Sequence, residues 1–172
     1  DTLLITNVQR AQDEGDYDVV VTNPGGQTTS IRVRLTVQTP PIIMTQPTNQ
    51  IVIAGRLTTL AVAATGNPAP GLQWYFNFNA LAGATGNLLT FANTQTDHDG
   101  NYYVVASNAA GSVTSQVARI TVLVPPTIVT QPTNSTVIAG ETAAFQVVAS
   151  GPGPLAYQWR FNGNPLPGAT GT

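Results

Sequence analysis

The protein has 172 residues, a formal net charge of −2, 42% hydrophobic residues and only 8% charged residues. This balance gives no basic surface for nucleic acid or for an anionic membrane. The absence of cysteine excludes disulfides, thiolate metal sites and cysteine nucleophiles, and no apolar run approaches the ~20 residues of a membrane span. Glycines and prolines among runs of Val, Ile and Thr favour short strands joined by tight turns.

Residues 1–39 are predicted to be the second half of a repeating unit. Their Gly15-Asp16-Tyr17 segment recurs as Gly100-Asn101-Tyr102, 85 positions later. The acidic run from Asp13 to Asp18 could offer oxygen ligands for calcium at a domain junction. Because Asp16 and Asp18 correspond to Asn101 and Tyr103, such ligands would not recur, and we expect no metal site.

Residues 40–124 form one whole unit of short strands with no helix. The predicted strands cover residues 42–45, 51–53, 57–65, 72–76, 88–91, 102–108 and 112–123. Pro47 interrupts the first strand, which suits a sheet edge because proline cannot donate to a ladder. In the strand around Trp74 the alternation places Leu72 and Phe76 inward beside the indole, and Gln73 and Tyr75 outward.

Residues 125–172 are predicted to be the first half of a third unit. The segment 126–134 repeats 41–49, and Gln158-Trp159-Arg160-Phe161-Asn162 repeats Gln73-Trp74-Tyr75-Phe76-Asn77 at the same 85-residue offset. An ungapped period of this length indicates a tandem array of one supersecondary unit. The predicted fold is all-β, with sandwiches following one another along the chain.

Three spaced motifs of the whole unit resemble an immunoglobulin domain of the intermediate set. These motifs are Gly66-x-Pro68 ahead of Trp74, Gly100-x-Tyr102, and Asn108-x-x-Gly111. The resemblance covers the whole chain and implies an immunoglobulin-like sandwich. Disulfide-free, threonine-rich, nearly identical units resemble the tandem arrays of large bacterial surface proteins, which implies an extracellular or cell-surface location.

The same resemblance implies where the core lies. The family's disulfide would join positions 62 and 104, where this chain has valines. Its tyrosine corner would use the residue two positions before the second cysteine, which is Tyr102 here and Tyr17 in the first segment. The implied core residues of the three segments are Trp74, Val62, Val104, Tyr102, Trp159, Val147, Val19 and Tyr17. Asp13 matches the family's acidic turn residue, but the whole unit has His98 there, which puts the usual turn bond in doubt.

The single histidine lies in Asp97-His98-Asp99-Gly100 and has two interpretations. It could be a metal ligand or a general acid/base, or it could belong to a polar turn between strands. The local sequence offers no catalytic partner, and no phosphate loop, zincin motif or nucleophile elbow occurs. We therefore favour the turn and predict no catalytic residue and no cofactor.

The outward face of the two central strands is the candidate protein contact face. In the whole unit it presents Gln73, Tyr75, Tyr103 and Val105, and exposed aromatics on one sheet suit either a contact patch or a scattered surface. In the half units Arg160 and Asp18 replace the two tyrosines. Their opposite charges would lie on neighbouring strands if the halves combined.

Neither terminal half can bury both faces of its strands alone. Two completions are open: flanking repeats of a longer parent chain, or residues 125–172 of one molecule added to residues 1–39 of another. The second contact is head to tail and leads to filaments unless it closes. The spacers Gln38-Thr39-Pro40-Pro41 and Leu123-Val124-Pro125-Pro126 predict stiff linkers and a semi-rigid rod that can also pack laterally.

These observations predict a non-enzymatic structural repeat of an extracellular fibre, surface coat or adhesin. Its expected partners are other copies of the repeat or chain, without nucleic acid and without membrane insertion in this segment. The alternative is a ligand- or carbohydrate-recognition module appended to a secreted enzyme, in which Tyr75 and Tyr103 would stack on sugar rings.

Overall fold

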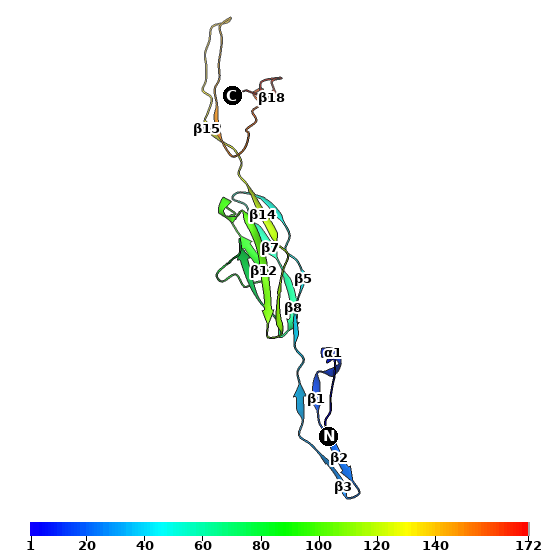
Figure 1. Ribbon diagram of the computed structural model, residues 1–172. Helices are drawn as coiled ribbons and strands as arrows, with labels where there is room; N and C mark the ends of the chain where they lie inside the picture. Colours follow the sequence, from blue (N-terminus) through cyan, green and yellow to red (C-terminus); the bar gives the residue numbers. More distant parts are fainter. Residues whose placement is uncertain (172) are drawn as a thin grey trace.

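The computed structural model describes residues 1–171. Figure 1 shows a closed β-sandwich in the middle, with the two terminal segments leaving from its opposite ends. The two ends of the chain therefore lie far apart.

The larger sheet of the sandwich is built around the strand that carries Trp74. Its order is β10 (Asn79–Ala80), β9 (Gly71–Phe76), β12 (Gly100–Asn108), β14 (Ala118–Leu123) and β6 (Gln50–Ile53), and β13 (Gly111–Thr114) also pairs with β12. All pairs are antiparallel except β14 with β6. In the β9–β12 ladder Trp74 lies opposite Val104, and Tyr75 lies opposite Tyr103.

The facing layer contains two strand pairs. In it β5 (Thr39–Thr45) pairs with β8 (Ala63–Asn67), and β7 (Thr58–Ala61) pairs with β11 (Leu88–Phe91). The strand predicted over 57–65 is therefore split at Val62, whose N–H donates to the carbonyl of Asn87 at 2.9 Å. The strand predicted over 112–123 is also split. The break begins at Ser115, whose hydroxyl accepts a hydrogen bond from the N–H of Val104 at 3.0 Å.

The core lies between these layers and confirms the predicted alternation. Its buried members are Leu60, Val62, Trp74, Tyr102, Val104, Ala118 and Ile120. Leu72 and Phe76 pack against this cluster, and the indole N–H of Trp74 donates to the carbonyl of Gly86 at 2.9 Å. The two positions where the resemblance implied cysteines thus hold buried valines beside the indole.

The terminal segments contain isolated two-stranded pairs. Residues 1–39 hold α1 (Arg10–Asp13), β1 (Gly15–Tyr17) paired with β4 (Val33–Leu35), and β2 (Val20–Asn23) paired with β3 (Gly26–Thr29). Residues 125–171 hold β15 (Thr127–Thr130) paired with β16 (Val148–Ser150), and β17 (Arg160–Phe161) paired with β18 (Asn164–Pro165). No described residue of either segment is fully buried.

The ungapped matching of the repeat stops at one turn. In the middle unit the turn is the 3-10 helix η1 (Thr96–His98), and the backbone N–H of Gln95 donates to His98. In residues 1–39 it is the single helical turn α1, and the N–H of Gln9 donates to Asp13, four residues on. The first turn therefore contains one more residue, and the segment before it matches the middle unit at an offset of 86.

The junction before the sandwich is part of a strand and not the separate stiff spacer that was predicted over 38–41. Strand β5 begins at Thr39, so Pro40 and Pro41 lie inside it, and Pro41 is buried. The side-chain amide of Asn67 donates to the carbonyl of Val37 at 2.8 Å, and that of Asn108 donates to the carbonyl of Thr39 at 2.8 Å. We call these two bonds the amide clamp, because they hold the incoming chain against the end of the sandwich.

Candidate functional site

The two outward tyrosines of the sandwich lie against each other. The ring centroids of Tyr75 and Tyr103 are 4.9 Å apart and the ring planes differ by 2°. Both residues are half-buried. Cross-strand stacking of this kind contributes roughly 0.5–1.5 kcal/mol, and it covers one face of each ring. Only the outer faces of the pair remain for a ligand.

Phe78 is a third aromatic residue of this face, and the sequence-based analysis missed it. Its ring centroid lies 6.4 Å from that of Tyr103, and the residue is 85% exposed. It occupies the β9–β10 turn with a φ of 71°, in the left-handed region that side chains other than glycine rarely adopt. The equivalent position of the last unit is Gly163, with a φ of 81°, so the contrast within the repeat was the available signal.

The other predicted members of the contact face are placed differently. Val105 is half-buried beside the tyrosines, whereas the Gln73 amide donates to the carbonyl of Leu81 at 2.6 Å and is engaged within the sandwich. Asp18 lies in the first segment and faces Arg32 at 3.5 Å. Arg160 lies in the last segment, at the opposite end of the molecule, so the structure does not bring these two charges together.

The histidine turn is held by local bonds. Nδ1 of His98 accepts the N–H of Gln95 at 2.9 Å, so the turn bond that was in doubt is made by the imidazole instead of a carboxylate. The Tyr102 hydroxyl donates to the carbonyl of His98 at 2.9 Å, as the tyrosine corner implied. Burial, with the negative charges of Asp97 and Asp99, raises the pKa of Tyr102 to about 12.

The carboxylates of the acidic run are engaged with arginines or backbone. Glu14 lies 3.1 Å from Arg10, Asp16 lies 3.0 Å from Arg34, and Asp13 accepts the N–H of Gln9. Within residues 1–171, no three His, Cys, Asp or Glu side chains gather as a metal site would need. This arrangement makes the run a set of surface ion pairs around the first turn.

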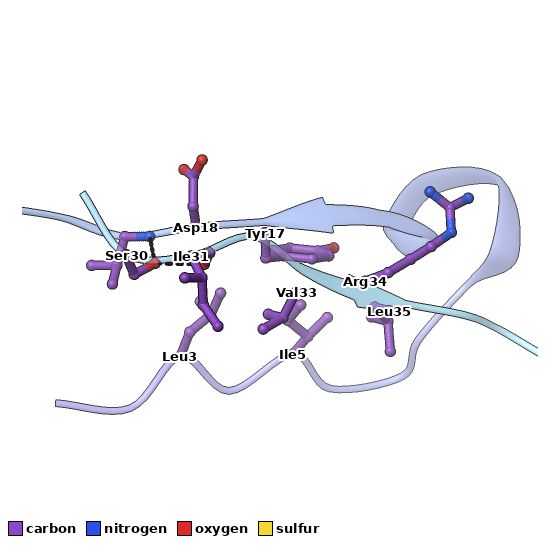
Figure 2. Close-up of a pocket in the computed structure, with 10 residues that line it drawn as sticks. Leu3, Ile5, Tyr17, Asp18, Ser30, Ile31, Val33, Arg34 and Leu35 are labelled. Carbon is purple, nitrogen blue, oxygen red and sulfur yellow. Dashed lines mark hydrogen bonds between the residues drawn. The ribbon is translucent and has the colours of Figure 1, made fainter.

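An open apolar surface lies on the first segment. Figure 2 shows Tyr17 and Val33 on the β1–β4 pair, and Leu3 and Ile5 on the N-terminal stretch with their side chains directed toward that pair; these residues line a hollow. Val19 is 57% exposed, whereas its equivalent Val104 is 0% exposed inside the sandwich. We call this surface the open face; Tyr17, Val19 and Val33 on it correspond to the buried Tyr102, Val104 and Ala118 of the middle unit.

Comparisons with known proteins agree with this architecture. Residues 40–108 match the family described as Immunoglobulin domain. A three-domain segment of titin superimposes with a TM-score of 0.65 at 22% identity, and the match covers 92% of this chain and 59% of that one. The fold is therefore all-β and immunoglobulin-like, and the resemblance inferred from the sequence motifs holds at the level of the domain.

Two relatives illustrate the range of proteins in which similar sequence occurs. Endoglucanase C of Cellulomonas fimi is 37% identical over 146 residues, which is 79% of this chain and 13% of that protein. Leucine-rich repeats and immunoglobulin-like domains protein 3 of Homo sapiens is 30% identical over 163 residues, which is 89% of this chain and 14% of that protein. The chain thus spans about a seventh of these relatives. Within residues 1–171, no helix is long and apolar enough to cross a membrane.

Proposed function

We propose that the chain is a structural repeat segment of an extracellular fibre, surface coat or adhesin of bacterial type, and that it catalyses no reaction. The 85-residue period carries this proposal, because it places whole or half sandwiches one after another along the chain. The amide clamp supports it further, since it leaves almost no free chain between the first segment and the sandwich.

The relatives are compatible with this role. Roundabout homolog 3 of Homo sapiens and hemicentin-2 of Mus musculus are 29% and 38% identical to this chain over 157 and 152 residues. We infer an extracellular or cell-surface location from the immunoglobulin-like fold and from these relatives. In the proposed array, neighbouring repeats or chains complete the terminal half-domains and supply the partners.

Electron microscopy of the native material tests the proposal. We expect elongated particles with an axial repeat that corresponds to one or two sandwich lengths. Globular particles without an axial repeat would contradict it. The measurement does not depend on how the half-domains are completed, because flanking repeats and added chains both give a linear array.

A second candidate is a carbohydrate-recognition module appended to a secreted enzyme. Two observations favour it: the likeness to an endoglucanase, and three aromatic rings gathered on one face, namely Tyr75, Tyr103 and Phe78. A glycan array separates the candidates. Binding that is lost on both Tyr75→Ala and Phe78→Ala, with the sandwich still folded, would favour recognition over a purely structural role.

A further inference from the structure

The middle unit shows which residues cover the equivalents of the open face when the sandwich is complete. Val33 is 58% exposed, and its equivalent Ala118 is 0% exposed. In the middle unit this face is covered by Trp74, Leu60 and Val62. The equivalents of those three residues lie in the last segment, where Trp159 and Val147 are half-buried and Phe145 is exposed.

Charge complementarity connects the two segments. In the middle unit the outward cross-strand pair is Tyr75 opposite Tyr103, with ring centroids 4.9 Å apart. The equivalents of these residues are Arg160 and Asp18. A composite of the two segments would bring this pair together beside Arg32, which already lies 3.5 Å from Asp18. Opposite charges at such positions stabilise a strand pair, and like charges destabilise it.

A buried pair of hydroxyl groups in the middle unit is replaced by two apolar residues in the terminal segments. In the middle unit the Thr94 hydroxyl donates to the Thr58 hydroxyl at 3.0 Å, and both residues are buried. With the offset of 86 before the first turn, Thr94 corresponds to Val8, and Thr58 corresponds to Ala143. Both hydroxyls are replaced by apolar groups together. Joining either segment to a middle unit would instead bury one hydroxyl without a partner, which is costly.

The last segment also keeps the side chains that hold the two halves of the middle unit together. Gln46 accepts the N–H of Gln116, Asn49 accepts that of Arg119, and Asn77 accepts that of Asn101, at 2.9, 2.8 and 3.0 Å. Their equivalents are Gln131, Asn134 and Asn162. The backbone N–H groups that these would reach, at Ile31, Arg34 and Asp16, belong to the first segment.

We propose that residues 126–171 of a second copy of this chain cover the open face of residues 1–39 and form a composite sandwich. The Asp18–Arg160 and Val8–Ala143 pairs would select this partner over a middle unit. The contact joins opposite ends of two molecules, so repeated addition gives a linear polymer. The inference rests on the proposed structural role and names the partner that completes the half-domains.

Sedimentation of the purified 172-residue chain over a range of concentrations tests the inference. We expect a concentration-dependent series of head-to-tail oligomers. Trp159→Ala should weaken the association more than about a hundredfold, because it removes the residue that fills the composite core. Asp18→Arg and Arg160→Asp should each weaken it about two- to fivefold, and the doubly exchanged chain should recover, because the opposite charges are restored.

The Val8–Ala143 pair provides an independent test by substitution. Val8→Thr and Ala143→Thr should each weaken association roughly tenfold, and the double variant should recover much of the loss through a hydroxyl pair like that of the middle unit. Monomers at every concentration would overturn the inference. Oligomers whose association is unchanged by the substitutions at both residue pairs would also overturn it, because nonspecific apolar association does not depend on such pairs. Neither result affects the axial repeat of native material, which tests the structural role separately.

Discussion

Residues 1–39 contain the equivalents of β12, β13 and β14 of the middle unit, but only the middle unit is closed. Tyr17 donates to the carbonyl of Asp13 at 2.7 Å, just as Tyr102 donates to that of His98 at 2.9 Å. Ser30 accepts the N–H of Val19 as Ser115 accepts that of Val104, both at 3.0 Å. Hydrogen bonds between residues 4 to 11 positions apart thus form in both units, whereas burial requires strands from the other half.

The largest contrast is expected at the two tryptophans. Trp74→Ala should lower the free energy of unfolding of the sandwich by about 3–5 kcal/mol, because it empties the centre of the core. Trp159→Ala is the matched control, since Trp159 lies outside that core. Denaturant unfolding followed by circular dichroism measures both. A similar loss in the two variants would contradict the assignment of Trp74 as the central core residue.

Alkaline pH should act on the closed unit through Tyr102. Its pKa is raised to about 12 in the folded protein, whereas an unfolded tyrosine ionises near its ordinary value of 10.0. Between these values only the unfolded state loses the proton, so stability falls as pH rises. The contribution is complete below about pH 10 and is lost above about pH 12; it amounts to about 2–3 kcal/mol.

Denaturant midpoints measured across that pH range test this prediction. Tyr102→Phe is the control, because it keeps the ring and removes the ionisable hydroxyl. Its stability should decline less over the same range, although it starts lower by about 1 kcal/mol for the lost hydrogen bond. Parallel declines in the two proteins would show that other groups cause the alkaline loss.

A smaller effect is expected at the buried hydroxyl pair. Thr94→Val should lower the free energy of unfolding by about 1–3 kcal/mol, because the Thr58 hydroxyl remains buried without its partner. Adding Thr58→Ala reproduces the combination found in the terminal segments and should restore most of the loss. A double-mutant cycle measures the coupling. Simple additivity would mean that the two hydroxyls do not depend on each other.

The smallest effect is expected at the β9–β10 turn. Phe78→Gly should stabilise the sandwich by about 0.5–1 kcal/mol, because glycine adopts a positive φ without steric cost and the lost ring is mostly exposed. The gain would make the turn resemble that at Gly163. Phe78→Ala separates the causes, since alanine removes the ring but keeps the strained backbone. An equal gain from alanine would exclude the backbone explanation.

Sequence reasoning located the core because its signals are local and periodic. The alternation around Trp74 and the spacing from Gly100 to Tyr102 each depend on residues within one strand or turn. The same reasoning did not find the Thr58–Thr94 pair, whose members are 36 positions apart and meet only through the fold. It favoured a turn at His98 but left the turn bond in doubt, because sequence alone does not show that the imidazole nitrogen accepts a backbone N–H.

The candidate surfaces were harder to predict for a related reason. Tyr75 and Tyr103 were expected on one face, but their mutual stacking, which covers one side of each ring, depends on side-chain geometry. The value of φ at Phe78 depends on a two-residue turn that ordinarily contains glycine. A comparison between repeats was the best guide, because a residue that differs from its counterpart marks a change in local requirements.

The amide clamp has a mechanical consequence for an array of such units. Asn67 and Asn108 donate hydrogen bonds to the carbonyls of Val37 and Thr39. A pulling force on the preceding segment therefore has to break these bonds before the linking chain can extend. The load then passes into β5 along its ladder with β8, where several bonds resist sliding together. Bending at this joint is limited by the same two side chains, so this joint would extend less under load than a free tether.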